Sequence, residues 1–320
     1  MSYVLGIDGG GTKTICVLIN SAGEVCGRGE AGPSNYQTVG LDAAGQSIAI
    51  AIKRAVPPEM DFADIAAIGL GLAGVGRPED QVVVHSVVQQ LPYRNDDPVQ
   101  LALPPECVYV SHDCAIALAG GTHQNVGIVA VAGTGSIAYG RNHEGVTGRV
   151  GGWGYLLGDE GSGYDIAIQG LRAVMRAFDG RQQPTRLTTD LMQQLELKTV
   201  EDLIAIVYRG NWKPKDIAAL APWVNAAAVA GDPVANQIID RAVAELVSMT
   251  EILCESLFKD SSFEIVTMGG VWAGTAKIRD RFEQEITRQY PQAKIIWPLH
   301  EPAYGAGILA WEQIISCHNN

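Results

Sequence analysis

The chain has 320 residues, a length that predicts two domains of ordinary size rather than a single core. Apolar residues make up 47% of the composition and charged residues 18%, which indicates a globular chain and excludes extensive disorder. The formal net charge of −12 argues against a surface that binds nucleic acid, although backbone amides and Mg2+ can still hold a small phosphate ligand.

Six cysteines, at positions 16, 26, 107, 114, 254 and 317, form no Cys-x-x-Cys pair or other metal-ligand spacing. We interpret them as reduced thiols. The opening residues do not combine a basic segment with an apolar one, and no uninterrupted apolar stretch is long enough to cross a bilayer. These features predict a soluble cytoplasmic protein without membrane attachment.

The hydrophobic pattern of the first part of the chain predicts an α/β lobe. Strands are expected over residues 3–8, 13–20, a segment ending near residue 30, 65–70 and 107–110. Helices are expected over residues 41–56 and 81–90. The proline- and aspartate-rich segment 91–105 interrupts these elements.

The strand–turn–strand plan of the N-terminus recurs further along the chain. Residues 127–131 predict a strand, 133–136 a glycine-containing turn, and 137–142 a second strand. With an offset of 122 residues, Gly11 falls on Gly133 and Thr12 on Thr134. We infer an internal duplication, and expect two α/β lobes related by pseudo-symmetry whose turns face one cleft.

The remainder of the second part is mostly helical. We expect a long helix over residues 159–178, helices through 188–258, a strand over 263–268 and a closing helix over 303–315. The predicted domains are residues 1–115, completed by the C-terminal helix 303–320, and residues 116–302.

The first turn reads Asp8-Gly9-Gly10-Gly11-Thr12. Glycines without Cβ atoms let several N–H groups approach an oxyanion, and threonine hydroxyls add donors, so the turn suits the phosphates of ATP. A tight hairpin without a ligand is the alternative. Asp8 at the strand end suits Mg2+ held through water. Lys13 either faces phosphate or is an exposed strand lysine.

Two further glycine turns are weaker signals by themselves. The turn Gly133–Ser136 could belong to any hairpin, but its place in the duplication assigns it to phosphate. Gly269-Gly270 ends the strand over 263–268 and leads into a helix. Since ligands bind beyond the carboxyl ends of strands, a base or ribose fits there, and an ordinary strand-to-helix turn is the alternative.

Asp113 follows a strand and opens a helix of small residues. It is either the helix N-cap or a general base that accepts a proton from an attacking hydroxyl. We assign no role to the neighbouring His112.

The segment Gly151–Gly163 combines six glycines with Trp153 and two acids. Trp153 offers an apolar face, and Asp159 with Glu160 offers acceptors, which suits a polyhydroxylated ligand such as a sugar. The alternative is that the acids favour the start of the following helix and Trp153 belongs to the core.

Taken together and in this order, the motifs resemble the actin-like (sugar kinase/Hsp70/actin) ATPase superfamily. Within it the chain resembles the BadF/BadG/BcrA/BcrD-type ATPases, in their N-acetylglucosamine kinase branch, over essentially its whole length. The resemblance implies an α/β fold of two actin-like (ribonuclease H-like) lobes, ATP and Mg2+ as cofactors, and a homodimer.

The resemblance also implies roles for individual residues. Asp113 would be the catalytic base, and Asp8 would hold Mg2+, through water. The nucleotide-binding residues would be Gly9, Gly10, Gly11, Thr12, Lys13, Thr14, Gly133, Thr134, Gly135, Ser136, Gly269, Gly270 and Val271. The sugar-binding residues would be Asn35, Asp113, Gly152, Trp153 and Asp159.

The chain departs from related families in two ways, and these departures restrict which metals we expect it to bind. Relatives that activate dehydratases hold an iron–sulfur cluster, but Cys107 and Cys114 lack the setting that such a cluster needs. The Cys/His zinc motif of some other sugar kinases of this fold is missing. No metal beyond Mg2+ is implied.

The expected function is transfer of the γ-phosphoryl group of ATP to a small-molecule amino sugar, foremost to the 6-hydroxyl of N-acetylglucosamine. A kinase for glucosamine or another amino sugar stays open, since a small change near Asn35 or Trp153 would alter acetyl recognition. A regulatory ATPase or sugar sensor with the same lobes stays open as well.

Overall fold

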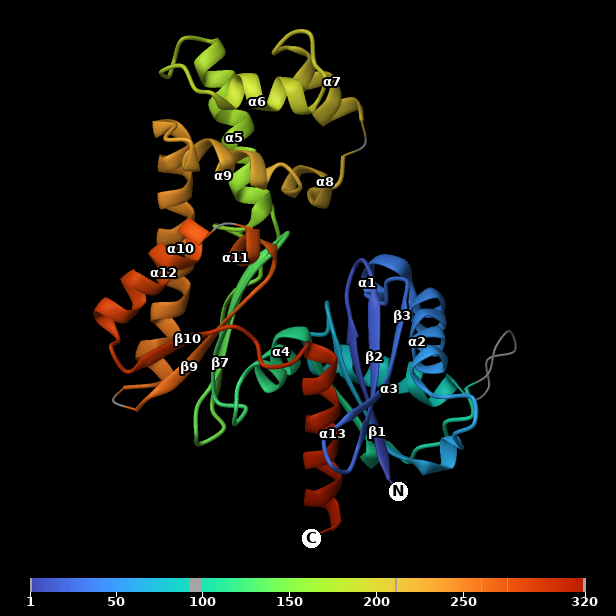
Figure 1. The fold of residues 1–320 in the computed structure, drawn as a ribbon. Coiled ribbons are helices and arrows are strands. Elements are labelled where there is room, and N and C mark those ends of the chain that lie inside the picture. Colours follow the sequence, from blue (N-terminus) through green and yellow to red (C-terminus); the bar gives the residue numbers. More distant parts are fainter. Residues whose placement is uncertain (1, 92–98, 211, 260, 275, 319–320) are drawn as a thin grey trace. The chain divides into compact units, whose positions relative to one another are not determined.

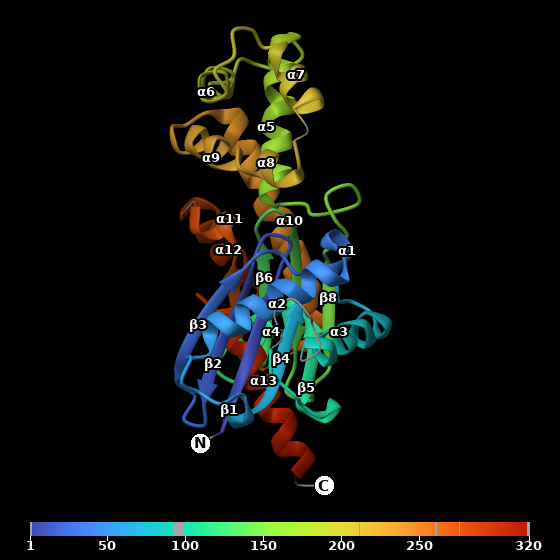
Figure 2. The same cartoon turned by 90° about the vertical axis from the view of Figure 1, so that its right-hand side faces the viewer.

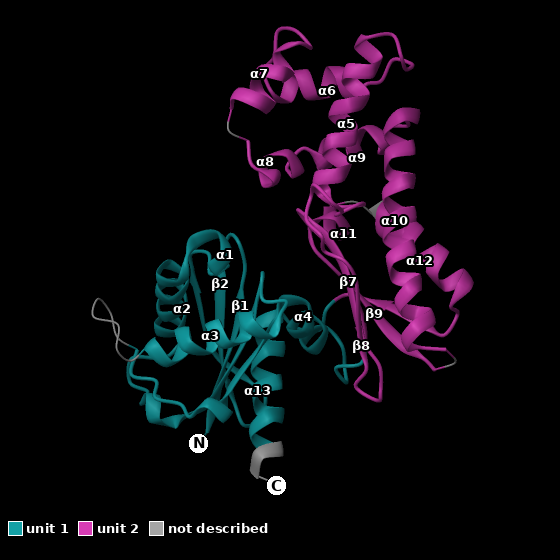
Figure 3. Ribbon diagram, turned by 180° about the vertical axis from the view of Figure 1, so that it is seen from behind, with its two compact units in different colours: residues 1–126, 298–320 teal, residues 127–297 magenta. Residues whose placement is uncertain are grey.

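A computed structural model of the chain describes residues 2–91, 99–210, 212–259, 261–274 and 276–318. Residues 92–98 of the predicted interrupting segment lie outside this description. The chain divides into unit 1, residues 1–126 and 298–320, and unit 2, residues 127–297 (Figure 3).

Both units contain strands and helices, labelled in Figure 1. The strands of unit 1 are β1 (Tyr3–Gly9), β2 (Thr14–Asn20), β3 (Val25–Ala31), β4 (Ile65–Leu72) and β5 (Val108–His112). Its helices are α1 (Tyr36–Val39), α2 (Leu41–Ala55), α3 (Pro78–Gln90), α4 (Asp113–Gly121) and α13 (Pro302–His318), with 3-10 turns at Phe62–Asp64 and Pro105–Cys107. The strands of unit 2 are β6 (Gly127–Ala132), β7 (Ser136–Arg141), β8 (Thr147–Gly151), β9 (Phe263–Met268) and β10 (Ala293–Ile296). Its helices are α5 (Gly163–Phe178), α6 (Leu187–Gln194), α7 (Asp202–Arg209), α8 (Pro214–Ala218), α9 (Ala221–Val229), α10 (Pro233–Leu257), α11 (Gly270–Gly274) and α12 (Ala276–Gln289).

The two sheets repeat one topology. The order is β3-β2-β1-β4-β5 in unit 1 and β8-β7-β6-β9-β10 in unit 2. In unit 1, β1 pairs antiparallel with β2 and parallel with β4. In unit 2, β6 pairs in the same way with β7 and β9. This repetition confirms the predicted duplication and the α/β fold of two actin-like lobes.

Helices cover both faces of the sheet in unit 1 (Figure 2). Leu5 and Ile7 of β1 belong to a core cluster with α2 and α3, whereas Val4 belongs to a cluster with α13. Because β1 is buried on both faces, its sequence is almost continuously apolar rather than alternating.

Within unit 1, helix α13 packs so closely on β4 and α4 that only glycine fits at the contact points. A Cβ on Gly69 of β4 would stand 1.9 Å from the carbonyl oxygen of Ala306. A Cβ on Gly305 would stand 2.0 Å from the carbonyl oxygen of Ile116 in α4. Since α4 packs on α13 and on β4, unit 1 continues to Val126, whereas the sequence placed its end at residue 115.

In unit 2 helix α10 packs across β6, β7 and β8. Helices α6 to α9 gather around α5 beyond the end of the sheet (Figure 1). The indole N–H of Trp272 in α11 donates to the carbonyl of Ala130 at 3.0 Å, which fixes the segment after β9 against β6.

Three elements differ from the sequence prediction. Helix α5 begins at Gly163 instead of residue 159, because Asp159 and Gly161 adopt left-handed conformations with φ of 62° and 76°. Strand β8 was not predicted because two of its five residues are glycines. Strand β10 was not predicted either, and it has only four residues.

Among the described residues no single helix has the length and apolar composition to cross a membrane, and the bent pair formed by residues 214–229 and 233–257 passes that test on length and composition alone.

We predict that Gly305→Ala lowers the free energy of unfolding by ~1–3 kcal/mol, because the new methyl group meets backbone atoms of α4 that cannot rotate away. Urea unfolding measures the change. The control is Gly76→Ala, at an exposed glycine of the same unit whose added Cβ meets no atom within 4 Å. Equal urea midpoints for the two variants would contradict the proposed packing.

Candidate active site

The turn between β1 and β2 keeps amides free at its tip. The N–H of Gly10 donates to the carbonyl of Lys13 at 2.9 Å, and Gly11 and Thr12 are exposed beyond this hydrogen bond. Within the described chain the amides of Gly11 and Thr12 have no acceptor. Unpaired backbone N–H groups in one loop are typical of an anion site, so the turn offers what the predicted phosphate site requires.

The carbonyls of Gly9 and Gly10 in the same turn are hydrogen-bonded inside unit 1. Gly10 accepts from the amides of Ser34 and Asn35 at 3.1 and 3.2 Å, and Gly9 accepts from the amide of Ala73 at 2.8 Å. A Cβ on Gly9 would stand 2.2 Å from the Ser34 hydroxyl, so this contact requires glycine. The segment that carries Asn35 is therefore fixed directly to the turn.

Asn35 caps the short helix α1. Its Oδ1 accepts from the amide of Gln37 at 3.1 Å, and its Nδ2 has no acceptor among the residues that the structure describes. In Asn35, a predicted sugar-binding residue, the amide oxygen is thus bound to the protein and the amide nitrogen is available as a donor.

Thr14 and Lys13 do not serve the turn as the resemblance implied. The Thr14 hydroxyl is fully buried, donates to the carbonyl of Gly32 at 2.7 Å and lies 2.8 Å from the Ser34 hydroxyl. Its side chain supports the turn from inside rather than contacting a phosphate. Lys13 lies 3.9 Å from the carboxylate of Glu30 in a solvent-exposed ion pair, which favours the alternative of an exposed strand lysine.

The parallel strands β1, β4 and β5 bring acidic residues together at their carboxyl ends. Asp8 is in register with Gly71, and Leu72 is in register with His112, the residue before Asp113. Burial foremost, and then the negative charges of Asp113 and Glu301, raise the pKa of Asp8 to about 6 against the opposing charge of Lys13. A bound cation would reverse this penalty, so the donor set fits Mg2+.

Glu301 is a member of this acidic group that the sequence did not indicate. It directly precedes α13 and pairs with Arg28 at 3.0 Å. No motif surrounds it, and only the return of α13 to unit 1 places it near Asp8.

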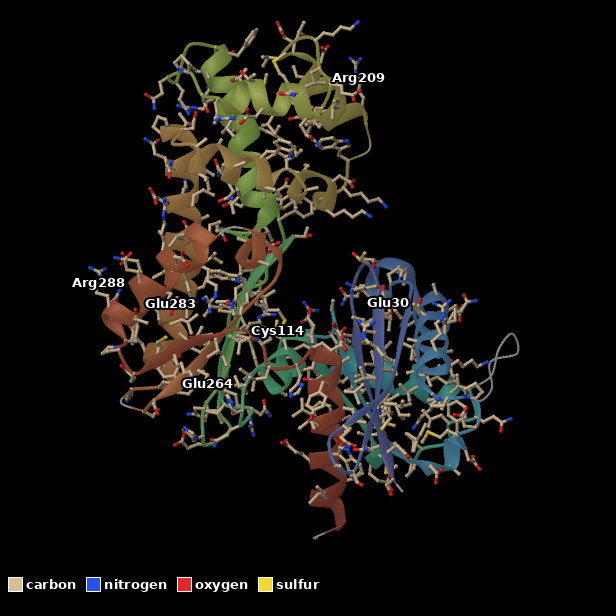
Figure 4. The ribbon with its side chains drawn as sticks, viewed as in Figure 1. Glu30, Cys114, Arg209, Glu264, Glu283 and Arg288 are labelled. Carbon is tan, nitrogen blue, oxygen red and sulfur yellow. The ribbon has the colours of Figure 1, made fainter. Side chains whose placement is uncertain are left out.

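His112, and not Asp113, is the N-cap of α4. Its Nδ1 accepts from the amide of Ala115 at 3.2 Å, which gives His112 a structural role that the sequence did not assign. Asp113 is the first helical residue, partly exposed, with Oδ1 accepting from the amide of Cys114 at 2.9 Å. Cys114, labelled in Figure 4, marks this helix start. The predicted capping alternative for Asp113 is wrong, and the role of its carboxylate as a base stays a prediction.

The turn between β6 and β7 repeats the plan of the first turn with different partners. The carbonyl of Gly133 accepts from the amide of Gly163 at 2.8 Å, and that of Thr134 from the amide of Tyr164 at 3.4 Å. These amides belong to the first turn of α5, whose unpaired donors need acceptors. The amides of Thr134 and Gly135 have no acceptor within the described chain.

Ser136 differs from its prediction in the same way as Thr14. Its side chain is 2% exposed and donates to the carbonyl of Glu160 at 2.7 Å. It anchors the loop that leads into α5, and its hydroxyl is not available to a phosphate.

Asp159 also supports the second turn. Its carboxylate accepts from the backbone amides of Ser136 and Gly154, and it lies so close to Gly135 that a Cβ there would stand 2.6 Å from Oδ2. Burial raises the pKa of Asp159, and the two amides partly offset this. Asp159 is held at φ 62°, an uncommon conformation for a residue with a side chain. Its contact with a sugar stays a prediction.

The glycines of the same loop have a conformational cause. Gly151, Gly152 and Gly154 have φ between 71° and 84°, where a side chain would be strained. Trp153 between them is 64% exposed, with the Arg149 guanidinium 4.8 Å from its ring centroid. Trp153 is therefore not a core residue, as the alternative required, and presents its ring to solvent.

Unit 2 contains a cavity of about 450 Å3 beside the second turn. Gly133 and Thr134 line it from the turn, and Gly270 and Val271 line it from α11. A Cβ on Gly269, whose φ is 115°, would stand 2.4 Å from the carbonyl oxygen of Ala132, so the end of β9 can pack here only with glycine. The structure thus brings the second predicted phosphate turn and the predicted adenosine motif to one cavity, whose remaining wall is mainly apolar.

A two-lobe α/β fold with one open glycine turn in each lobe defines the class of actin-like ATPases. A family model described as the BadF/BadG/BcrA/BcrD ATPase family matches residues 5–310. The chain belongs to this family.

Named relatives match the chain over almost its full length. It is 36% identical over 312 residues, 97% of this chain and 98% of the relative, to an N-acetylmuramic acid/N-acetylglucosamine kinase from Clostridium acetobutylicum. It is 36% identical over 321 residues, 96% and 97% of the two chains, to an N-acetyl-D-glucosamine kinase from Dictyostelium discoideum. A crystal structure titled as a putative N-acetylglucosamine kinase from Chromobacterium violaceum superimposes with a TM-score of 0.75 at 24% identity, covering 97% and 99% of the chains. The solved structure supports the fold.

We predict that Asp8→Asn raises the free energy of unfolding at pH 7.5 by ~1–3 kcal/mol, since each pH unit between the ordinary pKa of 3.8 and the raised value of about 6 is worth about 1.4 kcal/mol. Because the folded-state pKa is the higher one, wild-type stability from this group is complete below pH 3.8 and is lost as the pH rises through 6. The gain from the variant should therefore vanish near pH 4. Urea titrations at several pH values measure it.

The control for this experiment is Asp64→Asn, at an exposed aspartate of the same unit. Mg2+ should stabilise the wild type and Asp64→Asn but not Asp8→Asn. A gain from Asp8→Asn that is the same at pH 4 and pH 7.5 would contradict the buried acidic group.

Proposed function

We propose that the protein is an ATP-dependent sugar kinase that transfers the γ-phosphoryl group of Mg-ATP to the 6-hydroxyl of N-acetylglucosamine. The observation that carries the proposal is the pair of glycine turns at equivalent places in duplicated sheets. In each turn two amides, those of Gly11 and Thr12 and those of Thr134 and Gly135, have no acceptor in the described chain, while the carbonyls of Gly10 and Gly133 are hydrogen-bonded. Each turn offers donors to phosphate oxygens. Both named relatives act, by their names, on N-acetylglucosamine.

In this proposal Asp113 is the catalytic base. Its carboxylate takes the proton of the sugar hydroxyl, the hydroxyl oxygen forms a bond to the γ-phosphorus, and the bond from that phosphorus to the leaving oxygen of ADP breaks. Asp8 would hold Mg2+ through water, and the ion would neutralise charge on the phosphates. The turns contribute positioning, which is the main source of catalysis in phosphoryl transfer.

The sugar would meet groups that are attached to the turns. Asn35 has a free Nδ2 donor one hydrogen bond away from Gly10, and Trp153 exposes a flat apolar face. An N-acetyl group offers a carbonyl acceptor and a methyl group, which match such a donor and such a face. The amino sugar is thus the small-molecule partner, and we expect a cytoplasmic homodimer that binds neither nucleic acid nor membrane.

Three alternatives to this function are open to test. The first is a glucosamine kinase, because a small change near Asn35 or Trp153 could alter recognition of the acetyl group without changing any motif in the sequence. N-acetylmuramic acid is favoured as a second acceptor by the name of the clostridial relative. A regulatory ATPase or sugar sensor would hydrolyse ATP slowly and independently of sugars.

We predict that Asp113→Asn lowers kcat ~100–10,000-fold, because the amide cannot accept the hydroxyl proton. ATP binding, measured by calorimetry without sugar, should be retained. The matched control is Asp64→Asn, which should keep wild-type turnover. Wild-type turnover by Asp113→Asn would remove Asp113 from the mechanism.

The substrate is tested by coupled ADP release with glucose, glucosamine, N-acetylglucosamine and N-acetylmuramic acid. We expect the highest kcat/KM with N-acetylglucosamine, and mass spectrometry should find phosphate on its 6-oxygen. Preference for glucosamine would identify the alternative kinase. ADP release that no sugar accelerates would favour the regulatory ATPase and reject the kinase.

A further inference from the structure

Helix α9 buries one amide side chain among apolar neighbours. Asn225 is 9% exposed, and Val224, Ala227 and Ala228 around it are fully buried. In the described part of the chain, Asn225 Oδ1 is the one buried side-chain oxygen or nitrogen without a hydrogen-bond partner. Interior polar atoms are nearly always paired, so this exception calls for a physical reason.

The reason lies in the cavity that Asn225 lines. The same cavity of about 450 Å3 is bounded by Gly133 and Thr134 of the second phosphate turn and by Gly270 and Val271 of α11. Asn225 lines this space and its Oδ1 is buried without a partner, so a rotation of the side chain would present the amide to a ligand whose phosphates lie at the turn. An unpaired amide lowers folding stability, and a ligand that pairs with it removes that cost.

The lining of the cavity determines which chemical group of a ligand can bind beside the Asn225 amide. Apolar side chains line it on several elements: Ile166 of α5, Pro222 of α9, Ile239 of α10, Val271 of α11 and Ile278 of α12. Besides Asn225, the side chains of Thr134 and Lys215 are the polar or charged ones in this lining. A flat heteroaromatic ring fits walls that are mainly apolar and carry a few polar groups. An asparagine amide pairs one acceptor and one donor with the amino group and the adjacent ring nitrogen of adenine. Guanine presents two acceptors on the same edge, which leaves Oδ1 unpaired.

We propose that Asn225 selects adenine, by accepting a hydrogen bond from its exocyclic amino group and donating one to the neighbouring ring nitrogen. Specificity for ATP over GTP then resides in α9, and the Gly269–Val271 segment shapes the cavity without reading the base. The proposal rests on the proposed function as an ATP-dependent kinase.

The test is Asn225→Leu, a change of similar volume that removes both hydrogen-bonding groups. We expect the ratio of ATP to GTP in kcat/KM to fall ~10–100-fold, through a higher KM for ATP with kcat retained. The melting temperature of the free protein should stay equal or rise, because Oδ1 has no partner to lose. A purely structural asparagine would give a lower melting temperature and an unchanged ratio.

Asn236→Leu in α10 is the matched control. Its Nδ2 donates to the carbonyls of Ala228 and Asp232, both at 2.9 Å, so this amide is paired inside the protein. It should lower the melting temperature and leave the ratio of ATP to GTP unchanged. Asn225→Ala repeats the test if the leucine variant does not fold.

Calorimetry without sugar measures the binding of ATP and of GTP to the wild type, to Asn225→Leu and to Asn236→Leu. This measurement separates the proposal from the kinase assignment. Selective ATP binding that Asn225→Leu abolishes supports the role of Asn225 even if no sugar is phosphorylated. Equal affinities of the wild type for the two nucleotides, or an unchanged ratio in both Asn225 variants, would overturn it.

Discussion

In both units the carbonyl oxygens at the start of the glycine turn, those of Gly9 and Gly10 and those of Gly133 and Thr134, are hydrogen-bonded within the unit. This constraint determines what the turn can offer to a ligand. The N–H and C=O groups of a peptide plane point in opposite directions. Fixing the carbonyls of Gly10 and Gly133 inward therefore leaves neighbouring amides, such as those of Gly11 and Thr134, without protein partners. The anion site results from how the interior hydrogen bonds are distributed, and the glycines permit that distribution sterically.

The two units satisfy this constraint by different means. Unit 1 uses the loop amides of Ser34 and Asn35, whereas unit 2 uses the first amides of α5. The duplicated sheets have thus kept one turn geometry with unrelated supports. A consequence is that the candidate sugar residues belong to the supports: Asn35 lies in the first, and Asp159 holds the second through Ser136. Within each unit, hydrogen bonds therefore join the predicted phosphate donors to the predicted sugar-binding residues.

The sequence predicted what depends on local backbone chemistry. The glycine turns, the duplication and the strand over 263–268 follow from residue types that few other conformations tolerate. The sequence did not predict the roles of side chains whose partners lie in distant segments of the chain. The roles of Thr14 and Ser136 depend on loops that reach their hydroxyls, and Glu301 joins Asp8 only through the return of α13. Asn225 had a local signal, a single amide in an apolar helix, but its meaning depends on the cavity beside it.

Asp8 and Asn225 share a property that connects stability to function. The carboxylate is buried beside other acids, and the amide oxygen is buried without a donor, so each lowers the stability of the unliganded protein. Each is also the group that a component of the proposed ligand would satisfy, Mg2+ for Asp8 and adenine for Asn225. A ligand that binds only the folded state stabilises it in proportion to its affinity. Asp8 lies in unit 1 and Asn225 in unit 2. In each unit, binding of one component of the proposed ligand would therefore be linked to fold stability through one of these side chains.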